Sequence, residues 1–261
     1  MTSPLRFAVL GDPIGHSRSP AIHTAAMRHL GIEGSYEARR AGVAELEHAI
    51  EELRSGALDG MNITMPLKGA ANRAAESLTA EARTSKSVNT LRVRDGSLEG
   101  HSTDVVASVE ALADPRFDPG IPVLILGAGG AAAAVLAAAA ARTTYVAARD
   151  PQRAAAVAEL ARPPSAVVPF GTAVAGALVV NATPLGMNGE SLPANVVDVA
   201  SGVVDLAYGD DPTPVVRRAE ETGLAVMDGV EFLALQAAAA FEWWTGTPAP
   251  RDVMFEAARK R

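Results

Sequence analysis

The stretch VLILGAGGAA, residues 123–132, decides the fold of the C-terminal half of the chain. Four apolar residues run into a turn in which Gly127, Gly129 and Ala132 have the G-x-G-x-x-A spacing, and an alanine-rich helical pattern follows. Glycines at the end of a buried strand let the backbone turn tightly and approach a pyrophosphate at the N-terminus of the next helix. In this strand–turn–helix context the motif indicates a dinucleotide-binding site, whereas the spacing alone would also fit a close-packed turn without a ligand.

Short apolar runs alternate with helical patterns along most of the chain, which is typical of an α/β protein. After the glycine turn, further strands are expected at 143–148, 166–170, 177–184, 202–208 and 224–229. Their apolar residues are continuous rather than alternating, and this pattern predicts parallel strands that are buried on both faces of a sheet. The sequence therefore predicts a Rossmann-type parallel sheet in this part of the chain.

The first hundred residues predict a second α/β unit. The expected elements are strands at 6–11, 35–41 and 60–66, helices at 19–31 and 43–56, and a hairpin around Asp95–Gly96. An Asp-Gly pair between strand-like segments is a strong signal for a two-residue turn. In the second helix, the spacing of the apolar residues predicts a buried stripe made of Val43, Leu46, Ile50 and Leu53.

The composition is that of an ordinary globular protein, and it argues against several classes of function. The chain has 261 residues and a formal net charge of −7, whereas a nucleic-acid binder normally carries a basic face. It contains no cysteine, so that disulfides, thiolate metal sites and a cysteine nucleophile are excluded. The N-terminus lacks the pattern of a secretory signal, and no apolar stretch predicts a membrane span. We expect a cytoplasmic protein, monomeric or homodimeric, without nucleic-acid or membrane partners.

The residues that follow the second strand of the dinucleotide-binding unit bear on the choice between NAD and NADP. An acidic residue there would accept a hydrogen bond from the ribose 2′-hydroxyl of NAD, whereas an arginine would pair with the 2′-phosphate of NADP. The chain has Arg149 and Arg153 on either side of Asp150. The two arginines favour NADP, with NAD as the alternative cofactor. Asp150 would repel a phosphate if its carboxylate faced it, but it could instead cap the following helix.

Polar side chains gather at the strand ends of the N-terminal unit, namely Ser17, Ser19, Asn62, Thr64, Lys68, Asn89, Ser102, Thr103 and Asp104. Hydroxyls, amides, one amine and one carboxylate form a hydrogen-bonding set that suits a small polyhydroxylated acid. Each residue alone also has an ordinary explanation, such as a helix cap, a turn residue or a solvated cation.

The histidines do not predict a metal site. His16, His23 and His29 are separated by seven and six residues, which does not suit one metal ion on a helix. Capping or surface roles are expected for them, and no catalytic metal is expected.

Seven motifs appear in the order found in the shikimate dehydrogenase family: DPIGHSRSPAIH, NITMPLK, SVNTL, STD, LGAGGA, NATPLGM and DGVEFLALQAAAAFEWWTG. The chain resembles this family, which includes quinate/shikimate dehydrogenases, over nearly its whole length. The resemblance implies an oxidoreductase that reduces 3-dehydroshikimate to shikimate with NADPH, in the biosynthesis of chorismate and the aromatic amino acids. It also implies a substrate-binding catalytic domain over 1–104, completed by returning helices within 230–261, and a Rossmann domain over 105–229.

The resemblance assigns roles to particular residues. Lys68 and Asp104 match the catalytic pair at the reacting hydroxyl. The implied substrate-binding residues are Ser17 and Ser19 at the substrate carboxylate, Tyr208 beside it, and Thr64, Asn89 and Gln236. The expected cofactor-binding residues are Gly127, Ala128, Gly129, Gly130, Ala131, Arg149, Arg153, Thr183, Leu206 and Gly229.

Two departures from the family pattern lie next to the expected catalytic carboxylate. Ser102 stands where the family usually has asparagine, and Val105 stands where it has glycine. These changes bear on substrate preference, and they keep open a paralogue that acts on quinate or another hydroxylated ring acid with NAD or NADP. A non-catalytic sensor of cofactor or substrate is a third alternative, which the presence of both Lys68 and Asp104 disfavours.

Overall fold

The computed structural model describes residues 3–139 and 141–260, so that Met1, Thr2, Ala140 and Arg261 of the predicted domain ranges lie outside the described residues. The chain divides into two compact units, Met1–Thr103 with Leu233–Arg261, and Asp104–Phe232. Among the described residues, no helix combines the length and the apolar character needed to cross a membrane.

The first unit is built on a mixed six-stranded sheet. Its order is β2 (Gly34–Arg40), β1 (Leu5–Gly11), β3 (Gly60–Ile63), β5 (Thr90–Arg94), β6 (Ser97–His101) and β4 (Ser77–Leu78). The first three strands are parallel, and β5 is antiparallel to both β3 and β6. The β5–β6 turn has positive φ at Asp95 (51°) and Gly96 (77°), as a two-residue hairpin turn requires. The predicted hairpin is confirmed.

Side chains of β1 alternate between the two faces of this sheet, as the period of a strand requires. Ala8 and Leu10 belong to a core that is covered by α2 (Val43–Ser55), α3 (Lys68–Ala74) and α4 (Ala80–Ser85). Leu46, Ile50 and Leu53 of the predicted stripe are buried there, but Val43 is 57% exposed. Val43 is the first helical residue, and side chains lean toward the N-terminus of a helix, so that it points beyond the packed surface.

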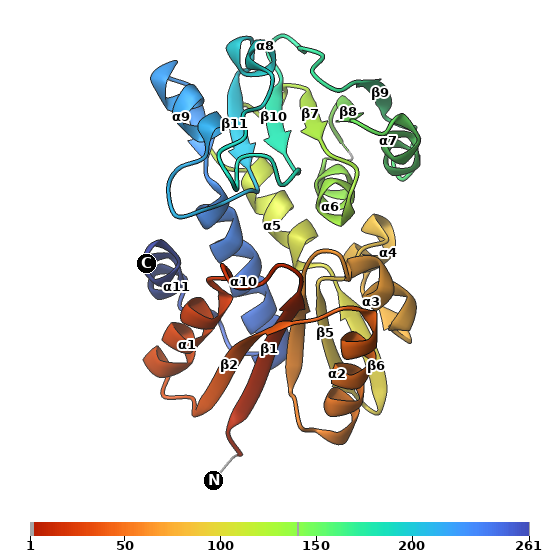
Figure 1. Ribbon diagram of the computed structural model, residues 1–261, viewed down its shortest axis with the longest axis vertical. Helices are drawn as coiled ribbons and strands as arrows, with labels where there is room; N and C mark the ends of the chain where they lie inside the picture. The colour runs from red at the N-terminus through yellow and green to blue at the C-terminus, as the bar shows by residue number, and fades with distance from the viewer. Residues whose placement is uncertain (1–2, 140, 261) are drawn as a thin grey trace. The chain divides into compact units, whose positions relative to one another are not determined.

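The opposite face is covered by α1 (Ser19–His29) and α10 (Gly229–Thr245), and α11 (Arg251–Arg259) packs against α1. Phe7 of β1 stacks on Trp244 with ring centroids 4.7 Å apart, and the indole Nε1 of Trp244 donates to the carbonyl of Leu91 at 3.1 Å. Figure 1 shows α11 beside α1. The C-terminal helices therefore return to the N-terminal unit, as expected.

The second unit has a six-stranded sheet in which all neighbouring strands are parallel. Its order is β12 (Ala225–Met227), β11 (Gly202–Asp205), β10 (Leu178–Asn181), β7 (Val123–Leu126), β8 (Thr144–Ala148) and β9 (Ala166–Pro169). Numbered along the chain, this is the Rossmann strand order, with the first strand at the centre. The helices of this unit are α5 (Thr103–Leu112), α6 (Gly130–Ala138), α7 (Pro151–Ala158), α8 (Ala194–Asp198) and α9 (Pro214–Glu221). The predicted fold class is confirmed.

One strand contradicts the expectation of burial on both faces. In β9, Ala166, Val167 and Pro169 are exposed, and Val167 retains 40% of its accessible surface. The cause is its place in the sheet, because β9 pairs only with β8 and forms the edge.

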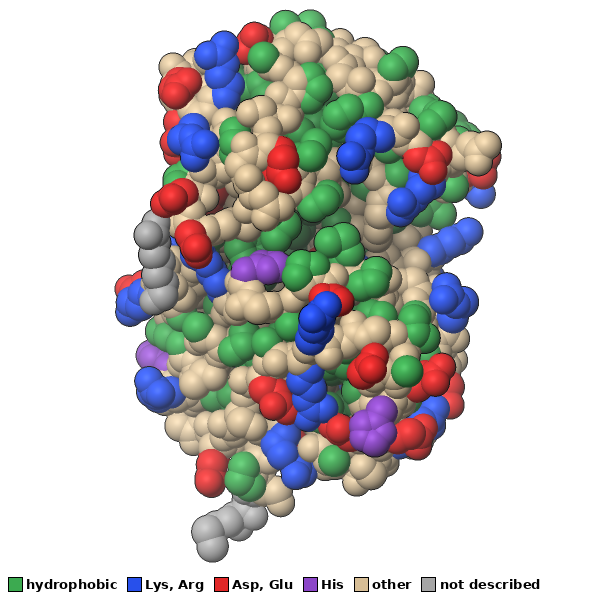
Figure 2. All heavy atoms as spheres, viewed as in Figure 1, with side chains coloured by type: hydrophobic (Ala, Val, Ile, Leu, Met, Phe, Trp, Pro, Cys, Tyr) green, Lys and Arg blue, Asp and Glu red, His purple; other side chains and the backbone are tan. Residues whose placement is uncertain are grey.

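Charged side chains of both signs are interspersed over the face of the molecule in Figure 2. Many charged residues form ion pairs, for example Arg54 with Glu76 at 2.9 Å and Arg218 with Asp198 at 2.9 Å. On that face, the part of the chain that the structure describes presents no large surface of a single charge.

Candidate active site

The topology of the first sheet brings four chain segments to one edge. β1 and β3 are parallel, so both end there, and antiparallel pairing places the start of β5 and the end of β6 at the same edge. Two hydrogen bonds close this edge: the Thr64 N–H donates to the Leu10 carbonyl at 2.9 Å, and the Ile63 N–H donates to the Asn89 carbonyl at 2.7 Å. Strand ends of this kind are rigid supports for binding groups.

The loop after β1 carries the two predicted carboxylate-binding serines. Ser17 is half-buried, and Ser19 is the first residue of α1 and only 4% exposed. The Ser17 N–H donates to the Ile14 carbonyl at 2.9 Å, and its Oγ accepts from the Ser19 N–H at 3.4 Å. Arg18 directs its guanidinium to the Ala258 carbonyl near the end of α11, at 2.8 Å, where a cation suits the helix dipole.

Asn89, Thr103 and Gln236 meet in a buried cluster. The Asn89 amide donates to the Thr103 hydroxyl at 2.9 Å and to Gln236 Oε1 at 3.4 Å. Its Oδ1 accepts from the Thr103 N–H at 2.8 Å. The two predicted substrate residues Asn89 and Gln236 are thus brought together from the start of β5 and from α10, with Thr103 between them.

Behind this cluster lies a chain of buried hydrogen bonds. The Asn62 amide donates to the Thr90 hydroxyl at 3.0 Å and to the Asn89 carbonyl at 3.2 Å. Its Oδ1 accepts from the Tyr36 hydroxyl at 2.7 Å. Tyr36 and Thr90 were not among the predicted site residues. The signal available for Tyr36 is that it is the one aromatic residue in an otherwise polar edge strand.

The expectation that His23 caps a helix or lies on the surface is wrong. Its side chain is fully buried, because it lies on the inner face of α1 with Ile22, Ala26 and Met27. The ring stacks on Tyr36 with centroids 4.4 Å apart and an angle of 6° between the planes. Neither ring nitrogen has a hydrogen-bond partner among the described residues. Burial lowers the pKa of His23 from 6.5 to about 3, so that the ring is neutral.

The predicted catalytic residues lie at the starts of two helices. Lys68 is the first residue of α3 and is half-buried. Asp104 is the second residue of α5 and is 6% exposed, and its carbonyl accepts from Ser108 Oγ at 2.7 Å. Lys68 belongs to the first unit and Asp104 to the second, and their meeting stays a prediction. Ser102 is fully buried, and its hydroxyl has no hydrogen-bond partner in the described part of the chain.

All ten predicted cofactor-binding residues follow the carboxyl ends of strands in the parallel sheet of the second unit. In parallel sheets this edge is where ligands bind, at the point where the strand order reverses beside β7. Gly127 has φ +124°, and a Cβ there would lie 2.7 Å from the Ala182 carbonyl oxygen. Gly129 is the N-cap of α6. The backbone of the turn therefore passes close to Ala182, and its approach to a pyrophosphate stays a prediction.

Asp150 caps helix α7, which is the alternative role predicted for it from the sequence. Its carboxylate accepts from the N–H groups of Gln152 at 2.9 Å and Arg153 at 3.2 Å at the start of α7. Arg149 and Arg153 are both exposed, and neither guanidinium forms a hydrogen bond or ion pair with any residue that the structure describes. Two guanidinium groups at this helix start fit a ligand that carries a phosphate group.

Gly229 is the first residue of α10, and the loop after β11 passes very close to its Cα. A Cβ at Gly229 would lie 2.2 Å from the Ala207 carbonyl oxygen. We therefore expect Gly229→Ala to displace the loop and to destabilise the protein by about 1–3 kcal/mol, with a lower Tm in thermal unfolding. Gly120→Ala is the matched control, because its Cβ would meet only the Asp118 carboxylate, at 3.3 Å. Equal Tm values for the two variants would contradict this prediction.

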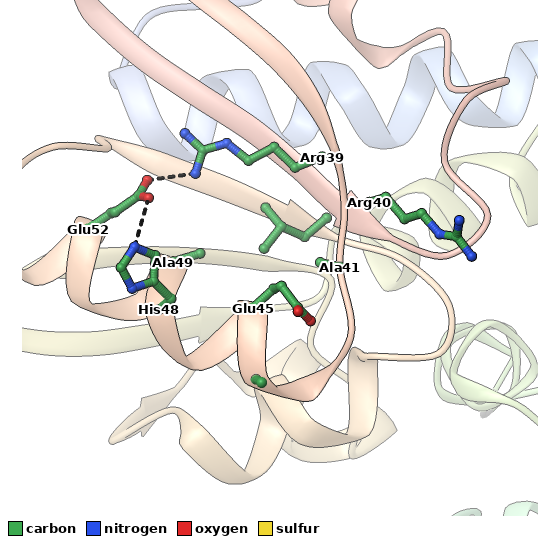
Figure 3. Close-up of a pocket in the computed structure, with 9 residues that line it drawn as sticks. Arg39, Arg40, Ala41, Glu45, His48, Ala49 and Glu52 are labelled. Carbon is green, nitrogen blue, oxygen red and sulfur yellow. Dashed lines mark hydrogen bonds and ion pairs between the residues drawn. The ribbon is translucent and has the colours of Figure 1, made fainter.

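A surface pocket of about 370 Å³ lies beside α2 and the end of β2 and contains none of the predicted site residues. Figure 3 shows Arg39 and His48 pointing toward Glu52, while Arg40 points away from it. Arg39 pairs with Glu52 at 2.6 Å, His48 lies 3.8 Å from the same carboxylate, and Arg40 pairs with Asp12 at 3.0 Å. Because these charged groups already have partners within the chain, we assign this pocket no function.

The chain is similar to known proteins over nearly its whole length. Residues 9–91 match the model of the shikimate dehydrogenase substrate binding domain, and residues 229–259 match that of the shikimate 5′-dehydrogenase C-terminal domain. A shikimate dehydrogenase (NADP(+)) of Thermus thermophilus is 42% identical over 98% of both chains. One of Archaeoglobus fulgidus is 37% identical over 97% of both.

A solved structure of a shikimate dehydrogenase has the same fold as this chain. The crystal structure of shikimate 5-dehydrogenase from Thermus thermophilus in complex with NADP(H) and shikimate superposes with a TM-score of 0.88. It is 40% identical in sequence and covers 98% of both chains. Identity at this level over nearly the full length, with the same fold, shows common descent. This chain belongs to the shikimate dehydrogenase family.

Proposed function

We propose that this protein is an NADP-dependent shikimate dehydrogenase that reversibly reduces 3-dehydroshikimate to shikimate, on the route to chorismate and the aromatic amino acids. The observation that carries the proposal is the cluster of Asn89, Thr103 and Gln236 at the sheet edge that also carries Ser17, Ser19, Thr64 and Lys68. Amides and hydroxyls at one edge match the vicinal hydroxyls of a hydroxylated ring acid. We place the enzyme in the cytoplasm, as a monomer or homodimer without nucleic-acid partners.

In this proposal the two units divide the work. Residues 1–104 with 230–261 bind most of the substrate, with its carboxylate at Ser17 and Ser19. Tyr208, which belongs to the other unit, lies beside that carboxylate. Residues 105–229 bind the cofactor through the glycine turn, the two arginines, Thr183, Leu206 and Gly229. The geometry that supports the cofactor site is the cradle at Gly127 together with the two guanidinium groups of Arg149 and Arg153.

When bound, NADPH supplies the hydride that reduces the ring carbonyl. Negative charge then develops on the carbonyl oxygen, and a cation or proton donor within hydrogen-bond reach stabilises it. Lys68 takes this role and gives the oxygen its proton. Asp104 orients the lysine and the substrate hydroxyl. In the reverse direction Lys68 receives the proton from the hydroxyl of shikimate.

The choice of cofactor leads to a prediction for Arg149 and Arg153. Replacing either with alanine should weaken NADPH binding by about tenfold or more, because hydrogen bonds to charged groups contribute roughly 1.5–3 kcal/mol each. NADH lacks the 2′-phosphate, so its dissociation constant should change little. Fluorescence titration with both cofactors checks the prediction, and an equal loss for NADH would contradict it.

Steady-state kinetics with shikimate and quinate, each with NADP and NAD, test the proposed function. We expect the highest kcat/KM with shikimate and NADP. The second candidate, a paralogue that acts on quinate, is favoured by one observation, the buried hydroxyl of Ser102, which has no hydrogen-bond partner among the described residues. A preference for quinate would select that candidate. Binding of shikimate without turnover under any cofactor would instead indicate a sensor.

A further inference from the structure

A buried carboxylate lies at the centre of the second unit, outside the residues assigned so far. Asp205 is the last residue of β11 and is fully buried. Burial raises its pKa to about 6, although its hydrogen bonds act in the opposite direction. A carboxyl group at the end of the apolar run GVVD is the only sequence signal that marks it.

Three donors from three segments converge on this carboxylate. Oδ1 accepts from the Asn181 amide at 2.8 Å and from the Ala207 N–H at 3.0 Å. Oδ2 accepts from the hydroxyl of Thr213, which also caps α9 by accepting from the Val216 N–H. We call Asp205, Asn181, Ala207 and Thr213 the Asp205 network.

One arm of the network reaches the loop after β10. Asn181 Oδ1 accepts from both the N–H and the hydroxyl of Thr183, at 3.1 and 2.6 Å. The Asn181 amide, besides binding Asp205, donates to the Leu185 carbonyl at 3.0 Å. The Leu185 N–H in turn donates to Thr183 Oγ1 at 3.1 Å. Asp205 therefore fixes the side chain of Asn181, and Asn181 in turn holds the loop that carries Thr183 through its hydrogen bonds.

A second arm reaches the loop after β11. The bond from the Ala207 N–H fixes the residue that lies between Leu206 and Tyr208. The carbonyl of Ala207 faces Gly229 so closely that a Cβ there would not fit. The Asp205 carboxylate thus fixes two loops: the loop after β10, which carries Thr183, and the loop after β11, which carries Leu206 and Tyr208. The loop after β10 also contacts the glycine turn, because the Ala182 carbonyl lies against Gly127.

Stability alone does not account for this arrangement. Taking a carboxylate out of water costs several kcal/mol, and well-packed apolar residues in its place are often as stable or more stable. Buried groups with strongly shifted titration cluster at functional sites. An acceptor with two oxygens can, however, hold three donors in a fixed relation, which no apolar side chain can do.

We propose that Asp205 is a positioning residue of the NADPH site: it fixes the loops after β10 and β11 in the arrangement that binds the cofactor. This inference rests on the proposed function, because the roles of Thr183 and Leu206 belong to it. Asp205 itself does not touch the cofactor in this proposal.

The experiment compares Asp205→Ala, Asp205→Asn, Thr213→Val and the control Asp198→Asn, which alters an exposed carboxylate of the same unit. Hydrogen exchange followed by mass spectrometry is measured on the cofactor-free protein, for peptides that cover 181–187 and 205–209. The Kd for NADPH is measured by fluorescence titration, and Tm by thermal unfolding. The exchange readout does not depend on cofactor or activity.

Asp205→Ala should speed exchange in both loops and raise the NADPH Kd about tenfold or more, since displacements near 1 Å can cost on the order of 10²-fold. Asp205→Asn keeps an acceptor for Asn181 and Ala207, so we expect partial rescue, with Kd raised roughly threefold. Thr213→Val removes only the arm to α9, and it should lower Tm while Kd stays within twofold. Asp198→Asn should match the wild type.

Three results would overturn the inference. One is wild-type exchange and Kd in Asp205→Ala. Another is a loss of NADPH affinity in Thr213→Val equal to that in the Asp205 variants, which would indicate a general structural role. The third applies if Asp205→Ala does not fold: a wild-type Kd for NADPH in Asp205→Asn would then overturn the inference. Failure of the wild type to bind NADPH would instead overturn the proposed function, while the exchange data would still decide whether Asp205 holds the loops.

Discussion

Lys68→Ala should lower kcat for shikimate oxidation by about 10²–10⁴-fold, the usual effect of removing a group that transfers a proton in the transition state. The amine acts mainly on the charge that develops at the oxygen, so its loss destabilises the transition state more than the bound substrate. KM for shikimate should therefore stay within a few-fold of the wild type. Steady-state kinetics at saturating NADP measure both constants.

Lys86→Ala is the matched control for this experiment. Lys86 is exposed, belongs to the same unit and ends α4, so that its variant should keep wild-type kinetics. A large rise in KM with a nearly normal kcat in Lys68→Ala would contradict the catalytic role and indicate a binding role. Asp104→Asn should lower kcat as well, if the carboxylate orients the lysine.

His23→Phe should change how the stability of the protein depends on pH. In the folded protein burial holds the pKa of His23 at about 3, against 6.5 for a free histidine. Between these values the unfolded chain binds one proton more than the folded chain, so the free energy of unfolding falls as the pH falls. The slope is about 1.4 kcal/mol per pH unit, and the loss reaches on the order of 5 kcal/mol near pH 3.

Phenylalanine cannot take up this proton and can keep the stack on Tyr36, so His23→Phe should lack that component of the acid sensitivity. Its larger ring costs about 1–3 kcal/mol at neutral pH. Its stability relative to the wild type should therefore improve steadily from pH 7 to pH 4. Urea unfolding at each pH unit measures the difference. His29→Phe alters an exposed histidine of the same helix and should follow the wild-type curve, and parallel curves for His23→Phe would refute the prediction.

The sequence predicts those parts of the fold that local signals determine. The glycine turn at Gly127, the hairpin at Asp95–Gly96 and the continuous apolar strands all depend on residues close together in the chain. The helix α9 was not predicted, although Thr213 and Pro214 mark its start and Gly223 follows its end. Its short apolar pattern, with Val215, Val216 and Ala219 buried, lies between two stronger strand signals.

The features that could not be predicted from the sequence depend on contacts between segments that are far apart in the chain. The exposure of β9 depends on which strand forms the sheet edge, and the burial of His23 depends on the helix face that meets Tyr36 and Trp244. Neither follows from spacing within one segment. The polar residues of the site were predicted at strand ends. Tyr36 and Thr90, which bind Asn62, and Asp205, which binds Asn181 and Ala207, were not predicted, because their roles depend on hydrogen bonds to residues far along the chain or on a neighbouring strand.

The division of the first unit between both ends of the chain has a consequence for biosynthesis. On the ribosome, residues 104–232 are complete before residues 233–261 have been made. The second unit can therefore fold during translation. Trp244, Gln236 and the carbonyl that accepts from Arg18 are supplied only by residues 233–261. Until that segment emerges, Phe7 lacks its stacking partner Trp244, and apolar surface left open in this way makes a nascent chain prone to aggregation.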